Sequence, residues 1–325
     1  MDNLRNAIAT KLLSIIPTHV KPIEYLMEIL NISRESVYRR LRGEISFTFE
    51  EIVMLSVDLG FSIDEIITKE IHSRVYFDMD FTNSLNPSDF FVSTFRHCCY
   101  DFDITMGRDT ESIMILNHVP PRFNVFFNHL FKFSYYRWMH RNQETSLKYF
   151  YSDVVLPAEL TALQNKMIEN SKKIRNNTLI LDSNVFLNLI REVQYYYKRK
   201  LIKENEFAAL IDDLQGLVSM VEGIAQSGYL FPETKFSLYL SSLNVESCSE
   251  YIKCNDEIKS QFYISSVEPV SVINPALCAI HKRWLDSMRK YSTLITQSNE
   301  LLQVRYFNKQ RKYIDDILEN PFYSF

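Results

Sequence analysis

Residues 26–67 read LMEILNISRESVYRRLRGEISFTFEEIVMLSVDLGFSIDEII and are the most informative stretch of the chain. At its centre lies NISRESVYRRLRG, residues 31–43. Asn31 suits a sharp turn, because Asn tolerates the left-handed backbone conformation nearly as Gly does. Ser33 then offers a side-chain oxygen that can cap unpaired backbone N–H groups. The stretch therefore predicts a helix, a tight turn and a second short helix over residues 34–42.

Two further helix starts follow in the same stretch. The pairs Thr48/Glu51 and Ser62/Glu65 have the S/T-x-x-E spacing of a capping box, and Gly60 stands where the first of these two helices must stop. In each of the three starts, the residue before the cap and the residue four after it are large and apolar: Ile32 with Val37, Phe47 with Ile52, and Phe61 with Ile66. Local chemistry thus predicts three short helices with defined ends.

The helix predicted over residues 34–42 has two different sides. Val37 and Leu41 are four residues apart and face inward. The candidate DNA-contacting side chains project from the rest of the helix: Arg34, Glu35, Ser36, Tyr38, Arg39 and Arg42. Arginine can bind a guanine edge or a phosphate, and residues near the start of such a helix reach base edges in the major groove. The alternative for this string by itself is a solvated helix face without a binding role, and the flanking caps favour DNA binding.

This stretch resembles the lambda-repressor and Cro-like helix-turn-helix family, and the resemblance covers about residues 1–69. The positions that match the family's pattern are Leu26, Leu30, Ile32, Ser33, Val37, Arg39, Gly43, Leu55, Leu59, Gly60, Ser62 and residues 64–66. The resemblance implies a five-helix domain that binds double-stranded DNA. In it, residues 34–42 would be the recognition helix and residues 22–30 the helix that crosses the DNA backbone.

Four positions depart from the family's pattern. Asn31 replaces the usual turn Gly, and Met27 replaces a small residue at the helix crossing. Arg40 stands where a bulky apolar residue is common, and Pro22 opens the second helix in place of a polar residue. These departures leave the expected fold unchanged and concern the phosphate contacts of the helix over residues 22–30.

Length and net charge indicate how many domains the chain has and how it could bind nucleic acid. Its 325 residues suggest about two domains, and 46% hydrophobic with 23% charged residues is an ordinary globular composition. The formal net charge is −4, so the chain as a whole does not attract nucleic acid. However, Arg34, Arg39, Arg40 and Arg42 cluster within one short segment. We therefore expect binding that depends on specific contacts and on dimerisation, rather than indiscriminate attraction to polyanions.

Cysteine usage and hydropathy predict a cytoplasmic protein. Five cysteines at irregular positions form no C-x-x-C pair, which fits a reducing compartment. The first residues, MDNLRNAIATKLL, are typical of an amphipathic helix rather than a signal peptide. Charges interrupt every apolar run before the length of about 20 residues that a membrane span needs, so no membrane association is expected.

Residues 70–325 are expected to form a second, larger domain. Helical periodicity predicts a hairpin of two helices over residues 186–197 and 207–224, a helix that Asn274 caps, and a last helix over residues 299–318. The segments KFSLYLSSL, CSEYIKC and SQFYISSV, between residues 235 and 267, alternate and predict three antiparallel strands. The expected fold class is therefore mainly α: a five-helix domain over residues 1–69, then a mostly helical domain with a small antiparallel β-sheet.

The chain lacks most sequence signatures of catalysis. Its six glycines form no phosphate-binding loop. His118, His129 and His140 are eleven residues apart, unlike the spacing of zinc ligands on a helix. We therefore expect no metal, no cofactor and no catalytic residues. Aromatic residues crowd residues 90–138 and are expected in the core, with a ligand pocket as the alternative. The basic clusters at 281–290 and 305–313 are expected to be solvated helix faces, with an anionic ligand or DNA as the alternative.

These observations support two hypotheses of different classes. The first is a bacterial-type transcriptional regulator, not an enzyme, whose C-terminal domain forms a homodimer and senses a small-molecule effector. The second is an interaction scaffold, or an unrecognised enzyme, that uses the helix-turn-helix segment to bind a partner protein.

Overall fold

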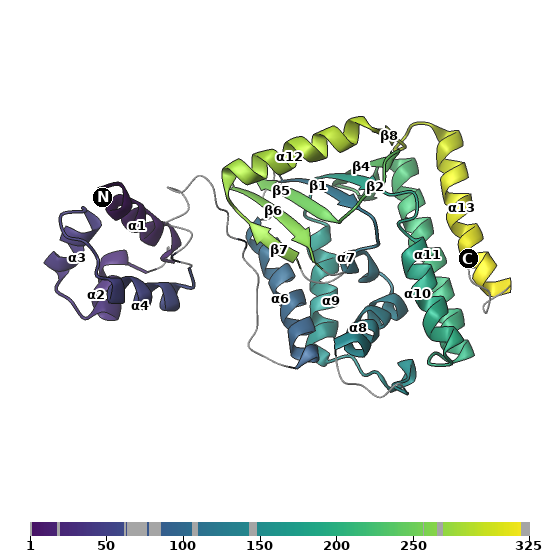
Figure 1. Ribbon diagram of the computed structural model, residues 1–325, viewed down its shortest axis with the longest axis horizontal. Helices are drawn as coiled ribbons and strands as arrows, with labels where there is room; N and C mark the ends of the chain where they lie inside the picture. Colours follow the sequence, from purple (N-terminus) through teal and green to yellow (C-terminus); the bar gives the residue numbers. More distant parts are fainter. Residues whose placement is uncertain are drawn as a thin grey trace. The chain divides into compact units, whose positions relative to one another are not determined.

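The chain separates into two compact units, Met1–Tyr76 and Phe77–Phe325 (Figure 1). The computed structural model describes residues 2–17, 20–61, 63, 77, 86–105, 110–142, 148–255, 257–264 and 269–319. The domain boundary expected near Lys69 falls outside these residues. In the described ranges, no helix combines the length and the apolar character that crossing a bilayer would require.

The first unit is built from short helices with well-defined ends. They are α1 (Asp2–Ile15), α2 (Pro22–Leu30), α3 (Arg34–Leu41) and α4 (Phe49–Leu59). The predicted cap at Ser33 and the capping box of Thr48 and Glu51 are confirmed, and Gly60, with φ of 67°, ends α4. The further helix expected after Ser62 lies outside the described residues.

Apolar periodicity gives the first unit a core of its own. Helix α3 packs against α1 and α2, and α2 packs against α4. The buried side chains of this core are Ile8, Leu12, Ile16, Leu26, Leu30, Val37, Phe47, Leu55 and Phe61. Because the inward positions of all four helices meet in one cluster, α3 is fixed relative to α1 and α2.

The second unit combines helices with a large sheet. Its helices are α6 (Pro87–Thr105), α7 (Pro121–Asn124), α8 (Asn128–Asn142), η1 (Tyr151–Asp153), α9 (Ala158–Ser171), α10 (Leu187–Lys198), α11 (Glu204–Ser227), α12 (Pro275–Lys290) and α13 (Glu300–Glu319). Its strands are β1 (Thr110–Leu116), β2 (Asn176–Leu181), β3 (Tyr229–Phe231), β4 (Thr234–Ser241), β5 (Ser249–Cys254), β6 (Glu257–Tyr263), β7 (Pro269–Val272) and β8 (Ser292–Leu294).

The sheet corrects the expected fold class. Within the described residues it has eight strands in the order β3-β4-β2-β1-β5-β6-β7, with β8 paired to β4. Its centre is parallel, because β2 pairs in parallel with both β1 and β4, whereas the other pairings are antiparallel. The expectation of a mostly helical domain with a small antiparallel sheet was therefore wrong. This unit is a mixed α/β structure.

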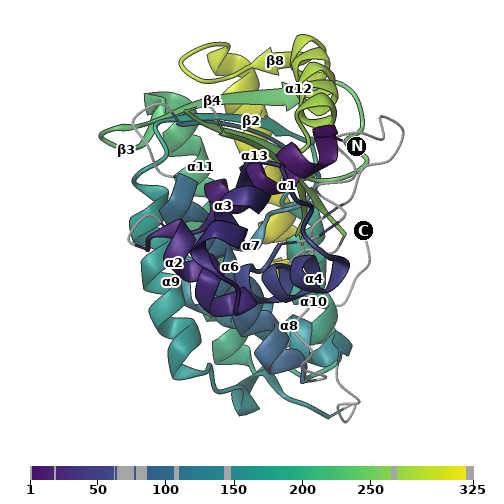
Figure 2. The ribbon, with the colours of Figure 1, turned by 90° about the vertical axis from the view of Figure 1, so that its left-hand side faces the viewer.

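The expected fold class was wrong mainly because the sequence pattern did not identify β1 and β2 as strands. Nearly every side chain of β1 is buried, and most of those in β2 are, because the sheet lies between α12 on one face and a layer of helices on the other (Figures 1 and 2). Strands buried on both faces show no alternation of apolar and polar residues, so a short apolar run does not identify them. Strand β4 does alternate and was expected, but its neighbours in the sheet are β2, β3 and β8 rather than β5.

Helix α12 covers one face of the sheet, and the layer that contains α6, α8, α9 and α11 covers the other (Figure 2). The predicted hairpin is confirmed as α10 and α11, with Gly228 ending α11 at a φ of 80°. The predicted cap of α12 is also confirmed, since the side chain of Asn274 accepts a hydrogen bond from the backbone N–H of Leu277. The aromatic residues of α6 and α8, including Phe91, Phe131 and Tyr136, lie in the core as expected.

A buried ion pair ties the sheet to α7. Both carboxylate oxygens of Glu250, on β5, accept hydrogen bonds from Arg122, at 2.8 and 2.9 Å. The Ser112 hydroxyl on β1 also donates to Glu250, at 2.6 Å. Buried charges are tolerated when they are paired and hydrogen-bonded in this way. This pair therefore holds α7 against the two adjacent strands.

Candidate nucleic-acid interface

The turn between α2 and α3 sets the direction of α3. Asn31 ends α2 in the left-handed conformation, with φ of 50°, as predicted. At the start of α3, the Ser33 side chain accepts a hydrogen bond from the backbone N–H of Ser36, at 3.3 Å. The two helices are thus joined by a short turn whose conformation is fixed by residues within it. This gives the sequence of helix, turn and helix that was expected.

The inner side of α3 is anchored at two points. Val37 is 1% exposed and lies in the core of the first unit. The guanidinium of Arg40 donates to both oxygens of Glu51, on α4, at 2.9 and 2.8 Å, and both side chains are only 14% exposed. In the sequence, Arg40 stood out as a departure from the family's pattern and as one of four clustered arginines. The capping-box spacing identified Glu51, but nothing local showed that Arg40 would reach it.

The outer side of α3 carries most of the candidate residues. Five of the six are exposed: Arg34, Glu35, Tyr38, Arg39 and Arg42. Ser36 differs from the rest, because it is half-buried and its Oγ accepts a hydrogen bond from the Ser33 hydroxyl at 3.0 Å. Its side chain therefore helps to cap the helix. The structure brings together the three arginines and the tyrosine on one accessible surface of α3, which we call the α3 surface.

The α3 surface is weakly cationic, because its three arginines outnumber the carboxylates of Glu35 and Glu44, and its ion pairs are weak. Arg39 and Arg42 share a single carboxylate, that of Glu44, at 3.5 and 3.2 Å. The side chains in both pairs are more than two-fifths exposed, so water and salt screen them and each contributes little to stability. Arg42 also lies over the Tyr38 ring, 5.9 Å from its centroid. Because these interactions cost little to break, the arginines can exchange Glu44 for a phosphate or a base edge.

Helix α2, which precedes the turn, offers fewer groups that could bind a DNA phosphate. Lys21 precedes α2 and forms an exposed ion pair with Glu24, at 3.1 Å, and its own side chain does not cap the helix. Pro22 opens α2, and proline has no N–H with which to bind a phosphate. The start of α2 therefore provides fewer backbone donors than a helix opened by a polar cap.

Comparison with known proteins gives no family. No family model, no curated protein and no solved structure matches this chain. In the described ranges, no three side chains of His, Cys, Asp and Glu converge to hold a metal ion. The function must therefore be inferred from the geometry of the molecule itself.

Proposed function

We propose that this protein is a sequence-specific DNA-binding transcriptional regulator whose first unit places α3 in the major groove. The observation that carries the proposal is the two-sided construction of α3. Val37 and Arg40 fix its inner side to the rest of the unit, while Arg34, Arg39 and Arg42 stand exposed on the α3 surface. A major groove about 12 Å wide admits one helix, and arginine binds guanine with two parallel hydrogen bonds.

The second unit is, in this proposal, the regulatory part that forms a homodimer. A single short helical unit buries little surface on DNA, so specific binding at physiological salt needs two such units on two half-sites. We place the protein in a reducing cytoplasm, where DNA is accessible and where the five cysteines, all free thiols, remain reduced.

A salt series of DNA binding tests the proposal. Purified full-length protein is titrated against random duplex DNA between about 50 and 200 mM salt, over which phosphate contacts make log affinity fall linearly with log salt concentration. Arg34→Gln and Arg39→Gln should each weaken binding. The slope of log affinity against log salt concentration should become shallower by about one for each phosphate that the variant no longer neutralises.

Arg96→Gln is the matched control, because Arg96 is an exposed, ion-paired arginine of the second unit. It should change neither affinity nor slope. If the wild type does not bind duplex DNA at low salt, the α3 surface has another partner, and the hypothesis of a protein-binding scaffold takes precedence.

A further inference from the structure

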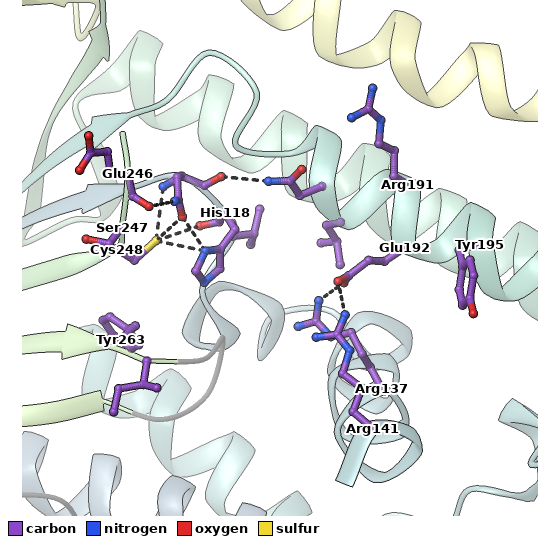
Figure 3. Close-up of a pocket in the computed structure, with 15 residues that line it drawn as sticks. His118, Arg137, Arg141, Arg191, Glu192, Tyr195, Glu246, Ser247, Cys248 and Tyr263 are labelled. Carbon is purple, nitrogen blue, oxygen red and sulfur yellow. Dashed lines mark hydrogen bonds and ion pairs between the residues drawn. The ribbon is translucent and has the colours of Figure 1, made fainter. Parts of the chain in front are cut away.

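The second unit has an open cleft of about 610 Å³ at one end of its sheet (Figure 3). Polar side chains that line the cleft bind one another. Arg137 and Arg141 on α8 both form ion pairs with the Glu192 carboxylate on α10, and the Cys248 thiol donates a hydrogen bond to the side-chain oxygen of Asn117, at 3.1 Å. These groups are therefore satisfied without a ligand. The outer side of α12 is built differently.

The basic cluster at residues 281–290 lies on α12. Lys282 and Arg289 both form ion pairs with the carboxylate of Asp286, at 2.8 and 3.1 Å. The exposed cations of the cluster are Arg283 and Lys290. A solvated helix face, as expected from the sequence, accounts for these two cations. It does not account for the apolar side chains that lie beside them.

A line of apolar side chains runs along the outer side of α12. Ile280, Trp284 and Tyr291 are spaced by four and seven residues, which places them above one another on a helix. They are 53%, 42% and 60% exposed, and Ile273, just before the helix, is 59% exposed. Figure 1 shows α12 along the outer edge of the second unit, over the sheet. We call these four residues the α12 stripe, and exposed apolar surface of this kind marks an interaction site.

The α12 stripe is arranged symmetrically along the chain. Position 282 is the midpoint between Ile280 and Trp284, and it is also the midpoint between Ile273 and Tyr291. When two copies of α12 pack antiparallel about a two-fold axis at this position, Ile280 of each copy meets Trp284 of the other, and Ile273 meets Tyr291. Each contact thus joins an aliphatic side chain to an aromatic ring. A homodimer with two-fold symmetry requires a self-complementary surface of this kind.

The α12 stripe is large enough for a reversible dimer. With about 200 Å² for a large side chain, its exposed fractions amount to roughly 400 Å² in each copy and roughly 800 Å² in a pair. The half-buried neighbours Leu277 and Met288 extend the contact toward the roughly 1,200 Å² at which specific interfaces begin. An interface near this lower limit forms and dissociates readily, so dilution should separate the two chains.

We propose that two copies of this chain pair through the α12 stripe, with their α12 helices antiparallel across a two-fold axis near position 282. This interface rests on the proposed function, because it assigns a surface to the homodimer of the second unit. The area of the stripe and its symmetric order support a second copy as the partner. The contact is apolar and lies wholly within the second unit.

The same arrangement brings two like charges together. Arg283 lies next to position 282, so the Arg283 side chains of the two copies approach each other on the same side of the helix pair. Salt screens the repulsion between exposed charges, whereas the burial of apolar surface needs no ion pair. Added sodium chloride should therefore strengthen the dimer, and Arg283→Gln should strengthen it several-fold at low salt. If added salt dissociates the dimer, ion pairs hold it together and the proposal is wrong.

Sedimentation velocity of the full-length protein over a concentration series tests the contact. The wild type should be dimeric, whereas Ile280→Lys and Trp284→Glu should each be monomeric, because each places two charges in an apolar interface. In an equal mixture of the two variants, the introduced lysine of one chain faces the introduced glutamate of the other, and the second Ile280–Trp284 contact stays apolar. A heterodimer should therefore form, a recovery that misfolded variants cannot show.

Val155→Lys is the matched control, because Val155 is an apolar residue of the second unit that is 83% exposed and lies outside α12. It should leave the dimer unchanged. If the wild type and both α12 variants are dimers, the interface lies elsewhere and the proposal is overturned, although the homodimer stands. If the wild type is monomeric at every concentration, the homodimer fails as well. A dimer that forms through α12 but binds no duplex DNA would leave this interface intact and contradict the proposed function.

A membrane surface is the rival partner for an apolar helix face with basic residues at its edge. Co-sedimentation with vesicles of phosphatidylglycerol and phosphatidylcholine separates the two partners. The wild type should remain in the supernatant. If the wild type is monomeric and sediments with the vesicles, and Trp284→Glu does not, the α12 stripe binds lipid rather than a second copy of the chain.

Discussion

Arg40 and Glu51 form a two-point ion pair that joins α3 to the start of α4. The two hydrogen bonds measure 2.9 and 2.8 Å, and Glu51 Oε2 also accepts the backbone N–H of Thr48, at 2.8 Å. One carboxylate therefore both caps α4 and holds the inner side of α3. The residues that face outward on α3 depend on this contact for their direction, although it lies on the other side of the helix.

Replacing Glu51 should loosen the first unit in a graded way. Glu51→Gln retains a side chain that can complete the capping box but loses the charge, and should cost about 1 to 3 kcal/mol of local stability. Glu51→Ala removes the cap as well and should cost about 1 kcal/mol more. Hydrogen exchange of peptides from α3 and α4, measured by mass spectrometry, reports both losses. Glu50→Gln, at an exposed neighbouring position, is the control and should leave exchange nearly unchanged.

Arg39 should contribute to base preference. Arg39→Ala should lower affinity for the cognate site by about 1 to 3 kcal/mol and relax the preference at one base pair, if the guanidinium holds a guanine. Selection of binding sites from random duplexes, followed by affinity measurement, checks this. Arg39 is exposed, so the variant should fold. An unchanged selected sequence and unchanged affinity would show that α3 is not the recognition helix.

The full-length protein should be a dimer. Light scattering at micromolar concentration should give twice the chain mass of 38.5 kDa, since paired recognition helices need a fixed separation of about 34 to 36 Å. A chain that remains monomeric both alone and on DNA would contradict the prediction.

The buried His281 should make the second unit sensitive to acid. Its ring nitrogens lie 2.9 Å from the hydroxyls of Ser260 and Ser249, the residue is 4% exposed, and burial lowers its pKa to about 4. The unfolded chain therefore binds the proton more readily, so stability falls as pH decreases from about 6.5 to about 4. The loss attributable to this one group is at most about 3 kcal/mol.

Denaturant unfolding at several pH values checks the effect of His281. The His281 ring stacks on Trp284, with ring centroids 6.0 Å apart, so the fluorescence of Trp284 reports this region, and Trp138 on α8 adds a signal from elsewhere in the same unit. His281→Gln has no proton to gain, and its stability should depend less on pH in this window. An identical pH dependence in wild type and variant would assign the acid sensitivity to other groups.

Cys248 should react slowly with alkylating reagents. The thiol is buried, and burial raises its pKa, so little thiolate is present at pH 7. Mass spectrometry after brief exposure to iodoacetamide should find the half-buried Cys98 modified before Cys248. In urea, which unfolds the chain, Cys98 and Cys248 should be alkylated at similar rates. If Cys248 reacts first in the folded protein, it is an activated nucleophile, and the hypothesis of an unrecognised enzyme gains support.

The sequence by itself determined the helices of the first unit, because their ends depend on residues close together in the chain. Ser33 and Ser36, Thr48 and Glu51, and the left-handed Asn31 and Gly60 act within a few positions of one another. Such local interactions are present in the sequence pattern before any tertiary contact forms. The exposed side chains of α3 follow from the same helical period.

Only the tertiary structure decided the form of the second unit and its cleft. The central strands β1, β2 and β4 are separated by long helical segments, and two of them are buried on both faces, so no local pattern shows which strands pair. The cleft joins residues equally far apart: Asn117 contacts Cys248, and Arg137 contacts Glu192. Packing of helices against the sheet brings these groups together, and the sequence around each of them carries no sign of its partner.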